Sequence, residues 1–176
     1  FPALTYVSGD LHFYENDLRP SLAFPLLTGV GGNLQVWTMA AMTSLTAPIL
    51  EDVSYDVYVD DNDALGQLVL PALRWVGENV WIGDNAVMTQ LKLPVIETID
   101  DDLDVYDHDA LSVIEVATSS TLEIGYDLYI EYNYALTSVQ IPGLAAVGDD
   151  MEIYDNTING SVVMGSAGPL ELGYWL

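Results

Sequence analysis

Acidic residues recur at a fixed interval in the middle of this chain. Asp61, Asp84 and Asp107 are separated by steps of 23 residues. Carboxylate oxygens are the ligands that Ca²⁺ prefers, so a column of stacked carboxylates could hold calcium ions. A solvated acidic face is the simpler interpretation, because the sequence has no EF-hand loop and no nonapeptide calcium loop. Calcium binding at these three residues is the alternative.

Paired carboxylates also carry out general acid–base catalysis, but that chemistry needs two of them positioned in a cleft. Regular columns on a flat sheet do not supply a cleft, and the chain has no long loops to form one. Its basic residues number only three, Arg19, Arg74 and Lys92. We therefore predict that the protein is not an enzyme and has no catalytic residues.

Tyrosine and tryptophan residues form a second periodic set. Its members are Tyr14, Trp37, Tyr58, Trp81, Tyr106, Tyr129 and Tyr154. Flat aromatic rings mixed with carboxylates suit stacking against a sugar or packing in a protein interface. Alternatively, the rings pack against one another across neighbouring strands, or they lie beneath an adjoining domain. The first interpretation predicts a binding surface for a glycan or a protein.

The charge of the chain narrows the range of partners. Twenty-seven acidic residues stand against three basic ones, which gives a formal net charge of −24. We expect no nucleic-acid partner, because binding phosphates needs clustered Lys and Arg. The stretch between Arg19 and Glu51 is uncharged, but Pro25 and Pro48 interrupt it, so we expect no membrane insertion. Cysteine is absent, which excludes disulfide bonds and thiolate metal sites.

These candidate residues belong to an internal repeat. Proline recurs in steps of 23 residues and returns once more later in the chain, at Pro2, Pro25, Pro48, Pro71, Pro94 and Pro142. An Asp or Asn stands eight residues after each of them, and an apolar–x–apolar step such as Val80 and Ile82 follows directly. Between Pro94 and Pro142, one unit carries a two-residue insertion near Ser119 and Ser120. The chain therefore contains seven units of about 23 residues.

Alternation of apolar and polar residues within each unit predicts short strands with one face inward. A unit of this length cannot bury its apolar side alone, so the units are expected to stack. The sequence predicts an all-β fold, a right-handed parallel β-helix or leucine-rich-repeat-like solenoid of about seven 23-residue rungs. We expect a single domain over residues 1–176 that is a segment of a longer protein. Open solenoid ends would allow self-assembly or contact with neighbouring subunits of a larger complex.

Two polar columns accompany the strands. Three residues after the apolar–x–apolar step, most units have an Asn, and the column consists of Asn16, Asn62, Asn85, His108, Asn133 and Asn156, with Met39 in the second unit. An inward Asn at a tight bend can hydrogen-bond the backbone of its own and neighbouring rungs, so we interpret this column as structural. The Asp or Asn before the first strand of each unit is interpreted as a turn residue in the left-handed conformation.

One unit carries a family resemblance in full. The segment from Pro71 to Leu93 reads PALRWVGENVWIGDNAVMTQLKL. It resembles the receptor L domain family, whose pattern is approximately Leu-Pro-x-Leu-x-x-Val-Gly-x-Asn-Leu-x-Ile-x-x-Asn-x-x-Leu, and so does the run from Leu136 to Asn156. That family includes the ligand-binding L domains of growth-factor receptors and related fungal cell-wall proteins. Bacterial surface repeats of the BspA type are similar in period and phrase.

The resemblance implies a leucine-rich-repeat-like β-helix in an extracellular or cell-surface setting, with no active site. Receptor L domains are flanked by cysteines, which this chain lacks, so receptor-style function is not implied. We expect a secreted binding or adhesion module. The alternative is a structural repeat of a surface layer or filament that assembles through its ends. The sequon Asn159-Gly160-Ser161 is compatible with a secreted protein.

Overall fold

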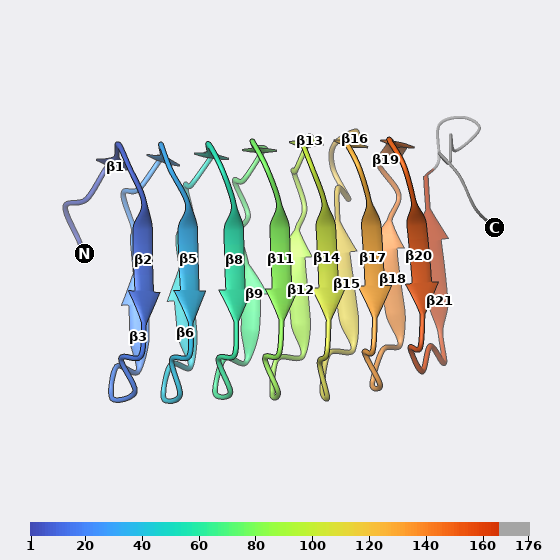
Figure 1. Cartoon of the computed structure of the whole chain (residues 1–176), viewed down its shortest axis with the longest axis horizontal. Coiled ribbons are helices and arrows are strands. Elements are labelled where there is room, and N and C mark those ends of the chain that lie inside the picture. The colour runs from blue at the N-terminus through green and yellow to red at the C-terminus, as the bar shows by residue number, and fades with distance from the viewer. Residues whose placement is uncertain (166–176) are drawn as a thin grey trace.

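The computed structural model describes residues 1–165, and this part contains twenty-one strands and no helix. The strands form parallel sheets around one core, and each turn of the chain adds one strand to each side (Figure 1). The β-solenoid of about seven turns, with roughly 23 residues per rung, is therefore confirmed. Within these residues, no helix is present that could span a membrane.

The sheet nearest the viewer in Figure 1 carries the predicted aromatic residues. Its seven strands are β2 (Leu11–Tyr14), β5 (Leu34–Trp37), β8 (Val57–Asp60), β11 (Val80–Gly83), β14 (Leu103–Tyr106), β17 (Leu128–Glu131) and β20 (Met151–Tyr154), in that order. Equivalent residues of successive rungs pair directly, as Val80 does with Leu103 and Trp81 with Asp104. Successive residues of a strand point to opposite faces, so each strand buries alternate side chains and leaves the others outside.

A second sheet of shorter strands closes another side. It contains β1 (Tyr6–Val7), β4 (Gly29–Val30), β7 (Asp52–Val53), β10 (Trp75–Val76), β13 (Thr98–Ile99), β16 (Leu122–Ile124) and β19 (Leu144–Val147). The third side consists of two sheets. The two-stranded sheet contains β3 (Ser21–Ala23) and β6 (Ser44–Thr46). The five-stranded sheet contains β9 (Gln67–Val69), β12 (Gln90–Leu93), β15 (Val113–Val116), β18 (Ser138–Ile141) and β21 (Ser161–Met164).

The core is built from ladders of apolar side chains, one from each rung. Val59, Ile82, Val105 and Ile130 form one such ladder, and all four are 0% exposed. Burying a side chain of this size contributes about 1.5–3 kcal/mol. Because no single rung encloses these side chains, the burial energy is gained only when rungs stack.

The two-residue insertion lies where the repeat placed it. Leu93 pairs with Val116, which is 23 positions later, whereas Thr98 pairs with Glu123, which is 25 positions later. The extra residues therefore occupy the corner between β15 and β16. Ala117 adopts a positive φ of 47° at this corner, and the register shifts again at Leu122 and Glu123. The corner absorbs the insertion, so the inward ladders continue beyond it.

Candidate ligand-binding face

The outward side chains of the sheet from β2 to β20 define a surface that we call the outer face. It consists of two columns set by the strand register. One column contains His12, Gln35, Tyr58, Trp81, Asp104, Tyr129 and Glu152, and the other contains Tyr14, Trp37, Asp60, Gly83, Tyr106, Glu131 and Tyr154. All seven aromatic residues singled out from the sequence lie on this one face. Most of them are half-buried, so each presents only part of its ring to solvent.

The N-terminal half of the outer face is a continuous aromatic strip. The rings of Tyr14 and Trp37 are stacked with centroids 4.6 Å apart. Trp37 and Tyr58 meet edge to face at 6.2 Å, and Tyr58 meets Trp81 in the same way at 6.3 Å. Each such pair stabilises the folded protein by about 0.5–1.5 kcal/mol in addition to the burial of the two rings. The rings therefore hold one another in place across four rungs. The aromatic surface that faces solvent is thus pre-organised before a ligand binds.

The middle of the outer face depends on a glycine. A Cβ at Gly83 would overlap the ring of Tyr106, so the absence of a side chain lets this ring lie across the neighbouring rung. The Tyr106 hydroxyl donates to Oδ1 of Asp60 at 2.9 Å, and the Tyr58 hydroxyl donates to Oδ2 of the same carboxylate at 3.0 Å. Burial and the Asp60 carboxylate raise the pKa of Tyr58 to about 12, and they raise the pKa of Tyr106 as well. Both hydroxyls therefore remain protonated at neutral pH and act as hydrogen-bond donors.

Two depressions meet at Trp81, one on the outer face and one at the bend that precedes strands β11, β14 and β17. One has a volume of about 280 Å³ and is lined by Trp81, Asp104, Tyr106 and Glu131. The other has a volume of about 370 Å³ and is lined by Asn79, Trp81, Asp101, Asp102, Tyr126 and Asp127. We call the two together the Trp81 groove. Trp81 and Tyr106 belong to the aromatic set predicted from the sequence, whereas Tyr126 and the carboxylates of the groove were not predicted as site residues. The strand register brings Asp104 beside the tryptophan.

The carboxylates of the groove are electrostatically unusual. Oδ1 of Asp104 and Oε2 of Glu131 are shielded from solvent and have no hydrogen-bond partner among the described residues. Burial, together with the negative charges of Asp102 and Glu131, raises the pKa of Asp104 to about 6. Burial and nearby carboxylates also raise the pKa of Glu131. Both groups would be stabilised by a donor or a positive charge supplied from outside the chain.

Asp61, Asp84 and Asp107, the predicted calcium column, each follow a strand of the same sheet. Their φ angles are 53°, 45° and 53°, which is the left-handed region that Asp and Asn tolerate. The same position is also left-handed where it holds Thr38 or Tyr132, so the conformation favours Asp without requiring it. In the part of the chain that the structure describes, no group of three or more His, Asp or Glu side chains gathers as metal ligands would. The three carboxylates are stacked along the solenoid rather than brought together.

The column before each strand of this sheet was wrongly interpreted as left-handed. None of its members, which begin with Asp10, Asn33 and Asp56, is among the described residues with positive φ. Every member except Asp150, in the last rung, instead accepts a hydrogen bond from the backbone of the next rung. Asn33 N donates to Asp10 Oδ1 at 2.8 Å, and Asp56 N donates to Asn33 Oδ1 at 3.1 Å. The left-handed position is at the other end of the strand, because the chain reverses more sharply there.

The inward Asn column satisfies the backbone at that sharp bend. The Asn85 side chain donates from Nδ2 to the carbonyls of Val59 and Gly83, at 2.9 and 2.6 Å, and its Oδ1 accepts from Asn62 N at 3.2 Å. Asn133 makes the equivalent donations to Val105 and Glu131. Asn16 and Asn156, in the end rungs, are less buried. A buried carbonyl or amide without a partner is destabilising by about 1–3 kcal/mol, which explains an amide side chain here.

His108 occupies this column but does not reproduce its bonds. Neither ring nitrogen, nor Oδ1 of Asn133 next to it, makes a hydrogen bond of good geometry among the described residues, and the Tyr106 backbone and the Asn133 side chain offset the burial of the ring only in part. We expect His108→Asn to stabilise the protein by about 1–2 kcal/mol at neutral pH, because an asparagine can donate to the carbonyls of Ile82 and Tyr106 as Asn85 does one rung earlier. Chemical denaturation of the two proteins measures the difference.

The same substitution should change how stability depends on pH. Burial lowers the pKa of His108 to about 4, below the value of 6.5 expected when the chain unfolds. The unfolded state therefore binds the proton more readily, and stability is lost as the pH falls from about 6.5 to 4. The advantage of His108→Asn should grow by about 3 kcal/mol over this window. His12→Asn on the outer face is the control, and an equal change in both variants would contradict the assignment.

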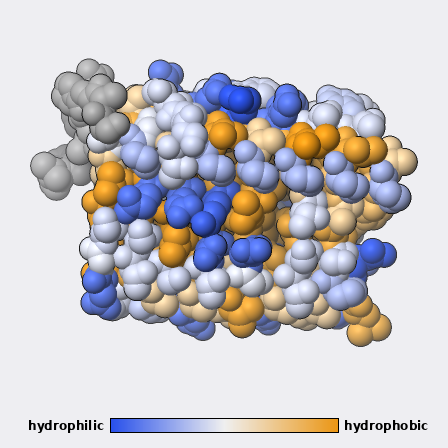
Figure 2. Space-filling model, turned by 180° about the vertical axis from the view of Figure 1, so that it is seen from behind, coloured by the Kyte–Doolittle hydropathy of each residue, from blue (hydrophilic) through white to orange (hydrophobic). Residues whose placement is uncertain are grey.

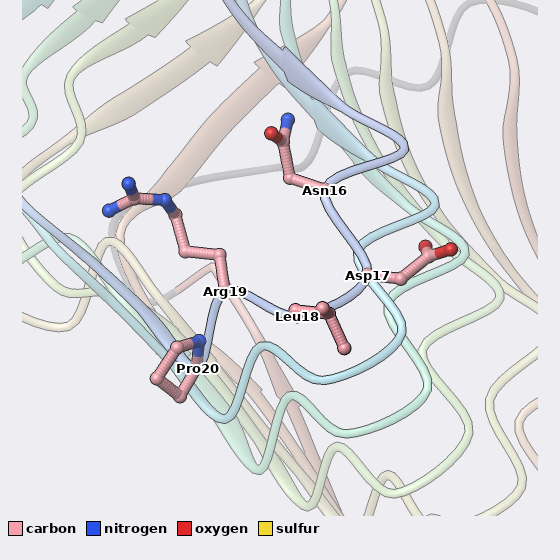
Figure 3. A pocket seen from close by; sticks show the side chains of 5 residues that line it. All are labelled: Asn16, Asp17, Leu18, Arg19 and Pro20. Carbon is pink, nitrogen blue, oxygen red and sulfur yellow. The ribbon is translucent and has the colours of Figure 1, made fainter.

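Other surfaces of the solenoid offer less chemistry. A hollow of about 550 Å³ at the first corner loop is lined by Asn16, Asp17, Leu18, Arg19 and Pro20. The side chains of Asp17 and Arg19 point away from each other there (Figure 3), and Leu18 is 94% exposed. On the side opposite to the outer face, apolar and polar residues are intermixed over the surface (Figure 2). Neither region combines rings with unpartnered polar groups.

Comparison with protein-family models, with curated proteins and with solved structures finds no match for this chain. The likeness to receptor L domains therefore stays a prediction from the repeat pattern. The function has to be inferred from the outer face itself.

Proposed function

We propose that this protein is a non-enzymatic binding or adhesion module of the cell surface, secreted from the cell, and that its outer face binds a glycan. The observation that carries the proposal is the outer face itself. Seven aromatic residues share one side of one sheet, and unpartnered carboxylate oxygens lie among them. The receptor L domain resemblance supports the extracellular setting.

A glycan suits this surface better than a peptide. Peptides commonly bind by adding a strand to a sheet edge or by laying a helix in an apolar groove, and the outer face is neither an edge nor an apolar groove. Sugars instead need flat rings for their apolar faces and acceptors for their hydroxyl groups. Trp37, Tyr58 and Trp81 supply the rings, and the carboxylates of Asp104 and Glu131, which line the groove, supply acceptors.

Replacing Trp81 by alanine should weaken glycan binding by about tenfold or more, because the ring borders both depressions of the groove. Titration calorimetry against a panel of neutral and amino oligosaccharides measures the effect. Trp75→Ala is a matched control, since Trp75 is 38% exposed but lies on β10 in a different sheet. The proposal fails if no saccharide of the panel binds, or if the two variants bind equally well.

A second function, assembly into a surface layer or filament, is favoured by the first rung. Leu4, Val7, Leu11 and Phe13 point toward the core but are only partly buried. Phe1 stacks on Phe24 at this end, with centroids 5.1 Å apart. Such an apolar end could stack on another solenoid. Light scattering over a range of protein concentrations tests this: growing polymers support assembly, and a constant monomer mass contradicts it.

A further inference from the structure

The Trp81 groove lacks any positive charge of its own. Of the three basic residues in the chain, Arg74 pairs with Glu97, and Lys92 lies 2.9 Å from Glu115 on the third side of the solenoid. Arg19 lies in the corner loop of the first rung. No cation of the chain therefore neutralises the carboxylates beside Trp81, and a positive charge has to come from the ligand.

The unpartnered oxygens of the groove define what a ligand must offer. An ionised carboxylate only accepts hydrogen bonds. Oδ1 of Asp104 and Oε2 of Glu131 are shielded from solvent by the protein, so a donor on a ligand has to reach the second oxygen of each of these two carboxylates. They line the same depression of about 280 Å³ as the rings of Trp81 and Tyr106. The ligand group that matches is a ring with an apolar face and a strong cationic donor on its edge. A neutral sugar has the face but lacks the charge.

We propose that the Trp81 groove binds an amino-sugar unit whose amine is free and protonated. This inference rests on the proposed glycan-binding function and specifies its ligand class. The apolar face of the sugar ring packs against Trp81, and the ammonium group donates to the carboxylates of Asp104 and Glu131. N-acetylation removes the charge and replaces the ammonium by an amide, so acetylated units bind more weakly. The second depression, lined by Asp101, Asp102 and Asp127, receives the neighbouring unit of the same chain.

The electrostatics of the site favour this ligand. Desolvation and neighbouring negative charges raise the pKa of Asp104, so ionising it in the empty groove is less favourable than in water. A bound ammonium offsets part of the surrounding negative charge and lowers the pKa of Asp104 again. Hydrogen bonds between ammonium and carboxylate groups are about twice as strong as those between neutral groups. The net charge of −24 also attracts a cationic glycan over a longer range at low salt.

The test compares a glucosamine tetramer with an N-acetylglucosamine tetramer by titration calorimetry at pH 6.5 and low salt. We expect the wild-type protein to bind the glucosamine tetramer about tenfold more tightly. In Asp104→Asn, which keeps the shape of the side chain but removes its charge, the preference should fall several-fold while N-acetylglucosamine binding is retained, and adding Glu131→Gln should reduce it further. Glu123→Gln is the matched control, since it removes an exposed carboxylate from β16, on another sheet. Circular dichroism verifies that each variant is folded.

The outcomes separate this inference from the proposed function. Equal binding of the two tetramers, or a preference that is unchanged in both Asp104→Asn and the Asp104→Asn/Glu131→Gln double variant, overturns the amino-sugar assignment and leaves glycan binding intact. Failure of every saccharide to bind overturns both. Octalysine is included as a third ligand, and if it binds at the groove while neither tetramer does, the partner is a basic polypeptide and the inference is wrong.

Discussion

Replacing Asn85 by leucine is expected to lower the free energy of unfolding by about 4 kcal/mol, because several buried backbone groups lose their partners at once. The carbonyls of Val59 and Gly83 both accept hydrogen bonds from Asn85 Nδ2. The amide of Asn62 donates to Asn85 Oδ1. Asn85 is 0% exposed, so water cannot replace these bonds without opening the rung. Leucine is similar in size, which limits the steric contribution.

Urea denaturation followed by tryptophan fluorescence measures this loss. Asn16→Leu is the control, since Asn16 stands in the same column but is exposed and makes one bond, from Nδ2 to the carbonyl of Tyr14 at 2.7 Å. That substitution should reduce stability by less than about 1 kcal/mol. A loss at Asn85 no larger than the loss at Asn16 would show that the inward amides do not stabilise the bend.

Replacing Gly125 by alanine is expected to reduce stability by about 3 kcal/mol, because the new Cβ would overlap the carbonyl oxygen of Asp100 in the preceding rung. Gly125 N also donates to the Ile99 carbonyl at 2.9 Å, so the backbone of two rungs is held close at this point. The obstacle is backbone rather than a flexible side chain, and it cannot move aside. Relief requires the rungs to separate, which weakens the hydrogen bonds between β13 and β16.

Gly66→Ala is the control for this substitution, because nothing lies within 4 Å of a Cβ at that position. We expect it to be neutral or slightly stabilising, since alanine has less freedom than glycine in the unfolded chain. Thermal melts of both variants measure the difference. A Gly125→Ala protein that melts at the wild-type temperature would mean that the rungs can shift locally without loss of pairing.

The seven-rung architecture could be predicted from the sequence because its cause is periodic. Inward residues such as Val59, Ile82 and Val105 recur at equal spacing, and every rung has to bury the same positions to share one core. The insertion near Ser119 and Ser120 was visible for the same reason, since it breaks an otherwise constant interval. The outward columns followed from the alternation along each strand.

The prediction put the left-handed residue before each of the strands β2 to β20, whereas it lies directly after the strand. Asp and Asn occur at both ends of the strands β2 to β20, and both residue types suit a turn. Composition cannot distinguish a side chain that tolerates positive φ, such as Asp84, from one that accepts a backbone hydrogen bond, such as Asn33. The choice depends on the direction in which the chain leaves the strand, and that direction is set by the corner of the solenoid.

The sequence by itself determined the rung length, the inward ladders and the side on which the aromatic residues lie, because each of these is a property of one unit repeated. Only the tertiary structure decided that Tyr106 covers Gly83 and bonds Asp60 two rungs away, and that Asp104 and Glu131 meet at Trp81. Those contacts join different units at positions where the repeat is irregular. Their geometry depends on the spacing between rungs and on the room that a neighbouring side chain leaves, so the candidate ligand site exists only once the solenoid has formed.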